Sequence, residues 1–317
     1  MLLPAQRESS SQSRDGTRPA DVRTAVITIV HGRHAHLRMH LRGLAASTKL
    51  PSSHVVVAMG DETVKTIVAQ EGSSAHVVEI DVPEGDPLPL ARARNIGAAK
   101  ARCRGAELLV FLDVDCIPAP TLLARYHETA CAENSTASLF CGPVTYLAQP
   151  LSSPITPDEM ALLHNPHPAR PAPPDRTVLR GDDFDLFWSL SFAVTEVTWQ
   201  TLEGFCEDYV GYGGEDTDFA WSAREKGVKL IWVGGADAYH QFHPVSDPPV
   251  EHLESILTNA WVFHQRWGQW PMQGWIDAFQ EMGLVKYRPH IQRWVQIRNS
   301  SSVNCGGAAL IRRRRGR

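Results

Sequence analysis

A glycine-rich run precedes three carboxylates in the segment 209–226, YVGYGGEDTDFAWSAREK. Glycine adopts backbone conformations that other residues resist, so a loop built from it can close over a ligand. Glu215, Asp216 and Asp218 stand where a helical pattern begins, and acids are stabilised at a helix N-terminus. An acidic helix cap would explain the acids but not the glycines and tyrosines before them. A carboxylate at a ligand-binding edge could instead accept a proton from an attacking hydroxyl.

A second pair of acids, Asp113 and Asp115, forms a D-x-D motif at the end of the apolar segment 107–115, ELLVFLDVD. Residues i and i+2 of an extended strand project to the same side, so we expect the two carboxylates to project together. Acids this close repel each other unless a cation lies beside them. Mg²⁺ and Mn²⁺ bind carboxylate and phosphate oxygens, so the pair favours a divalent ion holding a diphosphate. A solvated turn after a buried strand is the alternative.

Two histidines, His240 and His243, follow the last predicted strand in the segment AYHQFHP. We expect that strand to end at the same sheet edge as 107–115, where one imidazole could complete an Asp/His metal site. An isolated H-x-x-H is usually a surface pair, so the prediction depends on the aspartates. Arg94, near the start of a helical segment, could contact phosphate or the D-x-D pair. A solvated basic helix face is the alternative.

Alternating strands and helices are predicted to position these residues. Strand-like apolar runs occupy 24–33, 53–61, 75–83, 107–115 and 138–147, and helical runs occupy 36–47, 62–71, 90–103 and 121–132. This alternation predicts an α/β fold with a parallel sheet and crossover helices. Ligands of such sheets bind beyond the carboxyl ends of the strands, which is where Asp113 and Asp115 fall.

The second half of the chain is less regular. Residues 148–182 include the proline-rich run PHPARPAPPDR and predict a loop. A strand at 187–194, a helix at 195–205, a helix at 216–226 and a strand at 228–235 follow. Residues 251–267 and 271–283 predict two helices with four tryptophans near them. Packing on the sheet is the simplest role for these helices, and an acceptor platform is the alternative.

Composition excludes several classes of protein. The chain has 317 residues, of which 43% are hydrophobic, and a net charge of -4 at pH 7. These values exclude disorder of the whole chain and do not favour binding to nucleic acid. The six cysteines form no C-x-x-C pair, so we expect free thiols in a reducing compartment. No apolar run suits a signal peptide or a spanning helix, and we therefore expect a cytoplasmic protein.

Together these motifs resemble the family-2 GT-A glycosyltransferases. The shared elements are a strand followed by HGR, GD after the second strand, ARARNIG and FLDVDCIP. The later segment FWSLSFAVTEVTWQTLEGFCEDYVGYGGEDTDFAWSAREKG resembles the β-1,4-galactosyltransferases and related N-acetylgalactosaminyl- and chondroitin-type transferases. The resemblance covers about 24–244. It implies a GT-A nucleotide-sugar-binding fold, a Rossmann-like, mainly parallel mixed sheet flanked by helices, with a small helical C-terminal extension.

This resemblance divides the chain into four parts. They are a disordered tail at 1–22, a GT-A domain at 23–246, a helical extension at 247–296 and a basic flexible tail at 297–317. The arginine-rich end of the last part, IRRRRGR, could contact anionic lipid at the inner face of the membrane. A solvated tail is the alternative.

The resemblance also implies roles for single residues. The nucleotide sugar would be bound by His31, Gly32, Arg33, Asp61, Arg94, Asn95, Asp113, Tyr212, Gly213 and Gly214. Mn²⁺ or Mg²⁺ would be bound by Asp113, Asp115, His240 and His243. Asp216 matches the general base and Glu215 an acceptor-binding acid. Relatives often have G-W-G-G where this chain has G-Y-G-G, and this difference leaves the sugar open.

The reaction so implied is metal-dependent transfer of a sugar from a nucleotide-diphosphate sugar, a UDP-linked hexose or N-acetylhexosamine. The acceptor would be a hydroxyl of a glycan, a lipid-linked sugar or a small molecule, and the outcome inversion. A sugar nucleotidyltransferase is one alternative, although HGRHAHLR lacks its glycine-rich basic signature. A catalytically silent nucleotide-sugar-binding or scaffold protein is another, although the acids at 113, 115 and 216 are all present. A metal hydrolase built on the two histidines would need further ligands.

Overall fold

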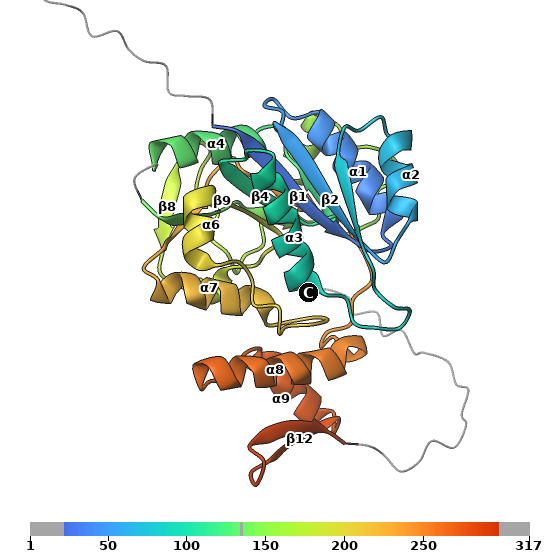
Figure 1. Ribbon diagram of the computed structural model, residues 1–317, viewed down its shortest axis with the longest axis vertical. Helices are drawn as coiled ribbons and strands as arrows, with labels where there is room; N and C mark the ends of the chain where they lie inside the picture. Colours follow the sequence, from blue (N-terminus) through green and yellow to red (C-terminus); the bar gives the residue numbers. More distant parts are fainter. Residues whose placement is uncertain (1–21, 134–135, 298–317) are drawn as a thin grey trace, which may run out of the picture.

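An eight-stranded sheet forms the centre of the computed structural model, which describes residues 22–133 and 136–297 (Figure 1). The strand order is β3-β2-β1-β4-β9-β6-β10-β8. The strands are β1 (Thr24–Val30), β2 (Ser53–Met59), β3 (His76–Ile80), β4 (Leu108–Leu112), β6 (Ser138–Cys141), β8 (Val178–Gly181), β9 (Ser191–Thr195) and β10 (Lys229–Val233). β9 runs antiparallel to β4 and β6, and β8 runs antiparallel to β10. The predicted mixed, mainly parallel sheet is confirmed.

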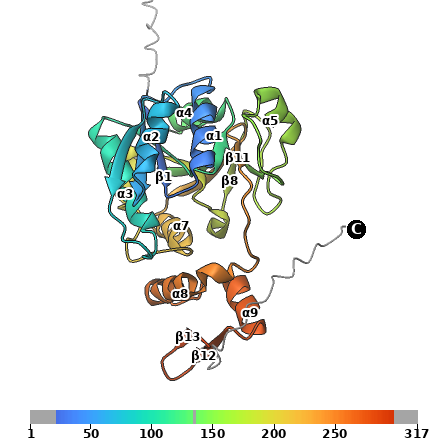
Figure 2. The same ribbon diagram turned by 90° about the vertical axis from the view of Figure 1, so that its right-hand side faces the viewer.

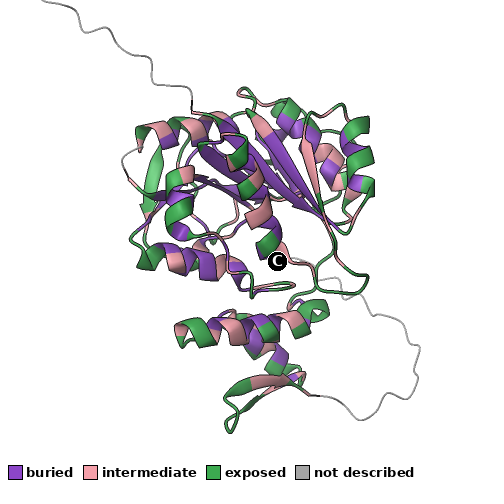
Figure 3. Cartoon of the chain, viewed as in Figure 1, coloured by how far each residue is buried: buried purple, intermediate pink, exposed green. Residues whose placement is uncertain are grey.

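Helices cover both faces of this sheet (Figure 2). One face packs against α1 (His34–Ala45), α2 (Thr63–Gln70) and α4 (Leu122–Ala132), and the other against α3 (Leu90–Cys103), α6 (Glu196–Leu202) and α7 (Glu215–Glu225). The central strands are therefore buried on both sides (Figure 3), which explains why runs such as TAVITIV lack polar alternation.

Small residues let α3 lie close to the sheet. Its buried side includes four alanines and Gly97. A Cβ atom at Gly97 would lie 2.5 Å from Ile27 Cγ2, so a larger residue would push the helix away from β1. This close packing fixes the position of Arg94, one turn earlier on the same helix.

A second sheet lies at the carboxyl ends of the main strands. It has the order β5-β11-β7 and consists of β5 (Cys116–Pro118), β7 (Val144–Tyr146) and β11 (Ala238–His240). The predicted single strand at 138–147 is therefore wrong, because β6 and β7 belong to different sheets. The chain bends at Gly142, where a Cβ atom would collide with the carbonyl oxygen of Ala236.

The segment predicted as a loop at 148–182 contains two regular elements. Helix α5 (Pro157–Leu163) begins with a capping box in which Thr156 and Glu159 bond each other's backbone N–H. Strand β8 then adds to the sheet edge. The next predicted strand begins at Ser191 rather than at 187, because a 3₁₀ turn, η1 (Phe184–Leu186), precedes it.

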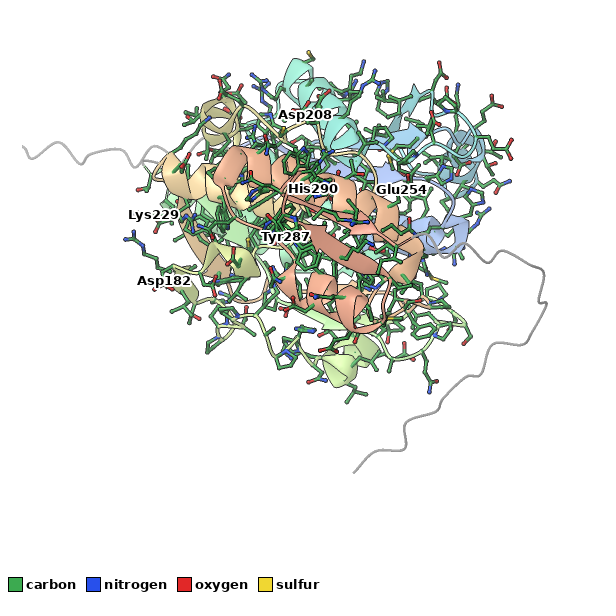
Figure 4. All side chains as sticks on the ribbon, turned by 90° about the horizontal axis from the view of Figure 1, so that it is seen from below. Asp182, Asp208, Lys229, Glu254, Tyr287 and His290 are labelled. Carbon is green, nitrogen blue, oxygen red and sulfur yellow. The ribbon has the colours of Figure 1, made fainter. Side chains whose placement is uncertain are left out.

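The C-terminal extension has its own small core. It consists of η2 (Val250–His252), α8 (Leu253–Trp267), α9 (Gln273–Glu281) and a hairpin of β12 (Val285–Arg288) and β13 (Arg293–Gln296). The prediction of helix is confirmed for α8 and α9 and wrong for the hairpin, because the side chain of Val285 packs with Ile256 and Phe279. In the view from below, α8, which carries Glu254, and the hairpin, which carries Tyr287 and His290, lie in front of the larger domain (Figure 4).

Within the two described ranges, no helix is long and apolar enough to cross a membrane. The predicted N-terminal tail, the basic C-terminal tail and its proposed lipid contact fall almost entirely outside those ranges.

A buried polar triad lies between α1 and the sheet. Thr28 Oγ1 lies 3.0 Å from His40 Nε2 and 3.1 Å from His54 Nε2, and His40 Nδ1 lies 2.8 Å from the carbonyl oxygen of Cys116. These bonds are all satisfied if His40 Nδ1–H donates to Cys116, Thr28 donates to His40, and His54 donates to Thr28. Both imidazoles are then neutral. Burial lowers the pKa of His40 to about 4 and that of His54 well below 6.5.

This triad predicts a loss of stability in acid. The unfolded chain protonates histidine near pH 6.5, whereas folded His40 stays neutral down to about pH 4. Stability present above pH 6.5 is therefore lost as the pH falls, by about 3 kcal/mol for His40 over the whole window. In urea unfolding without metal, the stability of His40→Gln relative to wild type should rise by that amount between pH 7 and pH 4. The exposed control His290→Gln should show a constant difference, and a constant difference for His40→Gln would contradict the account.

Candidate active site

Three possible metal ligands meet beside the carboxyl end of β4. Asp115 Oδ2 lies 3.5 Å from His240 Nε2 and 3.7 Å from His243 Nε2, and the ligand atoms of all three lie within 4.8 Å of one another. Pairing of β11 with β5 sets His240 opposite Cys116, and Gln241 N donates to the Asp115 carbonyl at 2.7 Å. The prediction that Asp115 and the histidines share one edge is therefore correct in its geometry, and both histidines take part.

Neighbouring side chains tune this group. Arg33 Nη1 lies 3.4 Å from Asp115 Oδ2, and the Tyr146 ring stacks on the His240 ring with centroids 4.5 Å apart. Burial lowers the pKa of His240, and this effect outweighs the opposing influence of Asp115. His240 is therefore neutral at neutral pH, which is the form that binds a metal.

Asp113, the first aspartate of the D-x-D motif, has a different partner. Arg94, whose side chain is 5% exposed, lies between Asp113 at 3.3 Å and Glu215 at 3.3 Å. Asp113 is outside the three-ligand group because the chain turns after β4, with Cys116 N donating to the Asp113 carbonyl at 2.9 Å. Burial raises the pKa of Asp113 to about 6, against the opposing effect of Arg94. The two carboxylates thus do not project as the pair expected of an extended strand.

Glu215 and Asp216 begin α7 at the same edge. Glu215 is 7% exposed, and its Oε2 is buried with no hydrogen-bond partner among the described residues. Burial and the neighbouring Asp216 raise the pKa of Glu215 to about 7. Asp216 is half-buried, and its Oδ1 accepts from the backbone N–H of Thr217 at 2.8 Å. Burial raises the pKa of Asp216, which makes it a stronger base than an ordinary aspartate.

The ends of β1 and β2 are tied together by Asp61. Its Oδ2 accepts from the backbone N–H of Gly32 at 2.8 Å and from His34 Nε2 at 2.8 Å. His31 Nδ1 lies 2.6 Å from the carbonyl oxygen of Met59. The structure therefore brings the predicted residues 31–33 and Asp61 to one place, and it adds His34, which the sequence patterns did not indicate.

Asn95 contacts protein backbone. Its amide donates to Phe205 O at 2.9 Å and to Glu207 Oε1 at 2.9 Å, and its Oδ1 accepts from Phe205 N at 2.9 Å. These bonds hold the segment that follows α6. The geometry therefore does not support the nucleotide contact implied for Asn95.

The glycine loop before α7 packs against the C-terminal extension. Its glycines all have positive φ, at 79° for Gly211, 95° for Gly213 and 89° for Gly214. The Tyr212 ring stacks on His252 at 4.5 Å and on Trp275 at 5.8 Å, and the tyrosine remains 40% exposed. Tyr212, which the resemblance assigned to the nucleotide sugar, therefore packs against aromatic rings of residues that lie outside the resemblance.

Asp218, the third acid of the cluster, joins α7 to α8. Its Oδ1 accepts from Tyr209 Oη at 3.1 Å, Arg266 Nε at 2.6 Å and Trp267 Nε1 at 2.7 Å. Asp218 is 1% exposed, so its role is structural. The spacing of Asp218 from Glu215 does not indicate this structural role, because two of its three partners, Arg266 and Trp267, lie 48 and 49 residues later in the chain.

Comparison with known proteins agrees with this fold. No protein-family model matches the chain. Validoxylamine A glucosyltransferase of Streptomyces hygroscopicus subsp. limoneus is 26% identical in an alignment 242 residues long, and the match covers 65% of this chain and 49% of that protein. The chain thus spans about half the length of the curated relative it matches.

Two solved structures are similar in fold. A crystal structure of GalNAc-T7 with UDP, GalNAc and Mn²⁺ gives a TM-score of 0.51 at 16% identity, covering 70% of this chain and 43% of that one. A crystal structure of S. aureus TarS 1-349 gives 0.50 at 12% identity, covering 77% and 66%. The predicted GT-A fold is confirmed.

The contacts of Asp218 predict a large cost for its removal. Asp218→Ala would leave Tyr209 and Trp267 without their acceptor and Arg266 without its carboxylate. We expect the free energy of unfolding to fall by about 3 kcal/mol in urea unfolding. Asp277→Ala, an exposed acid on α9, is the control and should change it by less than about 0.5 kcal/mol. Equal effects of the two variants would show that Asp218 does not join the helices.

Proposed function

We propose that this protein is a metal-dependent glycosyltransferase that moves a sugar from a nucleotide-diphosphate sugar to a hydroxyl acceptor. The observation that carries the proposal is the meeting of Asp115, His240 and His243 at the sheet edge where α7 presents Asp216. The name of the curated relative, a glucosyltransferase, supports this class of reaction. So does the fold shared with GalNAc-T7, whose structure holds UDP, GalNAc and Mn²⁺.

Asp115, His240 and His243 are the residues that would hold the metal ion. One carboxylate and two imidazoles suit Mn²⁺ better than Mg²⁺, because Mg²⁺ prefers oxygen ligands alone. A bound ion would offset the negative charge that develops on the departing nucleoside diphosphate. Arg33 adds a positive charge beside Asp115, at 3.4 Å. The nucleotide would lie along the ends of β1 and β2, near His31, Gly32 and Asp61.

Asp216 is the proposed general base. It would take the proton of the acceptor hydroxyl, whose oxygen then attacks the anomeric carbon from the side opposite the leaving group. The product therefore has the inverted configuration. The unpartnered Oε2 of Glu215 would bind the acceptor, and its raised pKa of about 7 lets it donate as well as accept a hydrogen bond. Arg94 contacts Glu215 and thereby limits repulsion between the acids.

The donor we propose is UDP-linked hexose or N-acetylhexosamine, and the acceptor a glycan, a lipid-linked sugar or a small molecule. Two exposed tyrosines border the acids and the metal ligands and offer faces on which sugar rings can stack. Tyr146 stacks on His240, and Tyr212 is next to the glycines of the glycine loop before α7.

A panel of nucleotide sugars tests this proposal. With Mn²⁺ the wild type should hydrolyse one donor slowly, because water can replace the acceptor. Asp115→Asn should abolish both the hydrolysis and the Mn²⁺-dependent rise in melting temperature. Asp216→Asn should keep the Mn²⁺ effect and lower turnover by about 10²- to 10⁴-fold.

The exposed acid variant Asp277→Asn should behave as wild type in both assays. If no donor is turned over and Mn²⁺ leaves the melting temperature unchanged, the proposed function is wrong. Full activity of Asp216→Asn would remove its role as the base.

A further inference from the structure

A single amide side chain of the C-terminal extension holds the glycine loop. Asn259 on α8 is fully buried. Its Nδ2 donates to the carbonyl oxygens of Gly213 at 2.8 Å and Tyr212 at 3.4 Å, and its Oδ1 accepts from the backbone N–H of Val210 at 3.3 Å. One side chain thus bonds three backbone groups directly before Glu215.

These backbone groups need such a partner. The loop belongs to no helix or strand, its bonds to Asn259 are partly buried, and backbone N–H and C=O groups withdrawn from water are costly without partners. A carboxamide both donates and accepts, whereas aspartate cannot donate and leucine can do neither. Asn259 is therefore matched to the loop by chemistry as well as by position.

The glycines allow α8 and α9 to approach the loop closely. A Cβ atom at Gly213 would lie 2.8 Å from Met272 Sδ, and one at Gly211 would collide with Ser255 Oγ on α8. On the other side of the loop, Gly211 N donates to Leu88 O at 2.9 Å. The glycines thus serve a fixed, tightly packed conformation, which differs from the freely closing hinge that their sequence suggests.

A second contact lies two turns further along α8. Arg266 and Trp267 both donate to Asp218, which follows Asp216 by two residues. α8 therefore bonds the chain on both sides of Glu215 and Asp216. Asn259 bonds the loop before these acids, and Arg266 and Trp267 bond Asp218 after them. The proposed metal ligands come from the end of β11, from His243 just after it and from the turn after β4, outside these contacts.

We propose that Asn259 is a positioning residue that sets the backbone from which Glu215 and Asp216 project. This inference rests on the proposed function, because it assigns the extension a part in aligning the base with the acceptor hydroxyl. Misplacement of a catalytic group by about 1 Å can cost on the order of 100-fold in rate. The effect should fall on turnover more than on donor binding, because the proposed nucleotide contacts at the ends of β1 and β2 and the proposed metal ligands lie outside the loop, which offers the donor only the Tyr212 ring.

The test compares Asn259→Leu, which removes all three bonds at similar volume, with Thr258→Ala. Thr258 is the adjacent residue, and its hydroxyl bonds only the carbonyl of Glu254 within its own helix. We expect Asn259→Leu to lower kcat of donor hydrolysis at least about tenfold, with KM for the donor within about threefold and the Mn²⁺ effect intact. Hydrogen exchange of the backbone amides at 210–214 should also become faster in Asn259→Leu. Thr258→Ala should change neither kcat nor the exchange rate.

A second variant and the exchange measurement allow this proposal to fail independently of the proposed function. Asn259→Ser, a smaller change, replaces Asn259→Leu if the latter does not fold, and the same split between kcat and KM is expected. Faster exchange at 210–214 with unchanged kcat would overturn the positioning role, as would a rise in KM alone. If the wild type turns over no donor, the proposed function fails, whereas the exchange measurement still decides whether Asn259 holds the loop.

Discussion

The buried guanidinium of Arg94 is the contact on which the geometry of the site depends. It lies 3.3 Å from Asp113, at the end of β4, and 3.3 Å from Glu215, at the start of α7. Without this cation, the buried Glu215 would lie near the half-buried Asp113 and Asp216 with no balancing charge, which is unfavourable. Because α3 packs closely on the sheet through Gly97, the cation has little freedom to move. Arg94 thereby sets the distance between the strand that leads to the proposed metal ligands and the helix that carries the proposed base.

The site combines proposed metal ligands that strand pairing holds in place with a glycine loop whose conformation depends on contacts from the C-terminal extension. The small sheet β5-β11-β7 sets His240 against Asp115 by ordinary strand pairing. The glycine loop has no such pairing and takes its conformation from α8 and α9. The C-terminal extension is therefore more than an appendage to the GT-A fold. It supplies an amide to the loop backbone and two aromatic rings to Tyr212.

Sequence patterns predicted those features that depend on strand order. Apolar runs alternating with helices imply a mainly parallel sheet, and such a sheet brings Asp115 and His240 to one edge. The resemblance to GT-A transferases also placed Asp61 and residues 31–33 correctly beside each other. Predictions based on local periodicity failed where the chain turns. Asp113 and Asp115 contact different partners because the strand ends at Leu112, and the apparent strand at 138–147 bends at Gly142.

Other features depend on partners distant in sequence. The resemblance implied a nucleotide contact for Asn95, and spacing grouped Asp218 with the other acids, but in the structure Asn95 bonds Phe205 and Asp218 bonds α8. The residues next to Asn95 and Asp218 in the sequence do not indicate either of these contacts. Asn259 is an ordinary polar residue in a helical run, and only the folded chain shows that it faces three backbone groups of the glycine loop. The hairpin at the end of the extension likewise depends on packing against α8.

The most direct test of the central claim is electron paramagnetic resonance of bound Mn²⁺, measured for the coupling of the ion to ligand nitrogen. We predict coupling to two imidazole nitrogens in the wild type and to one in each of His240→Ala and His243→Ala. A Mn²⁺ spectrum without nitrogen coupling, or one unchanged by both substitutions, would contradict the assignment of Asp115, His240 and His243 as the metal site.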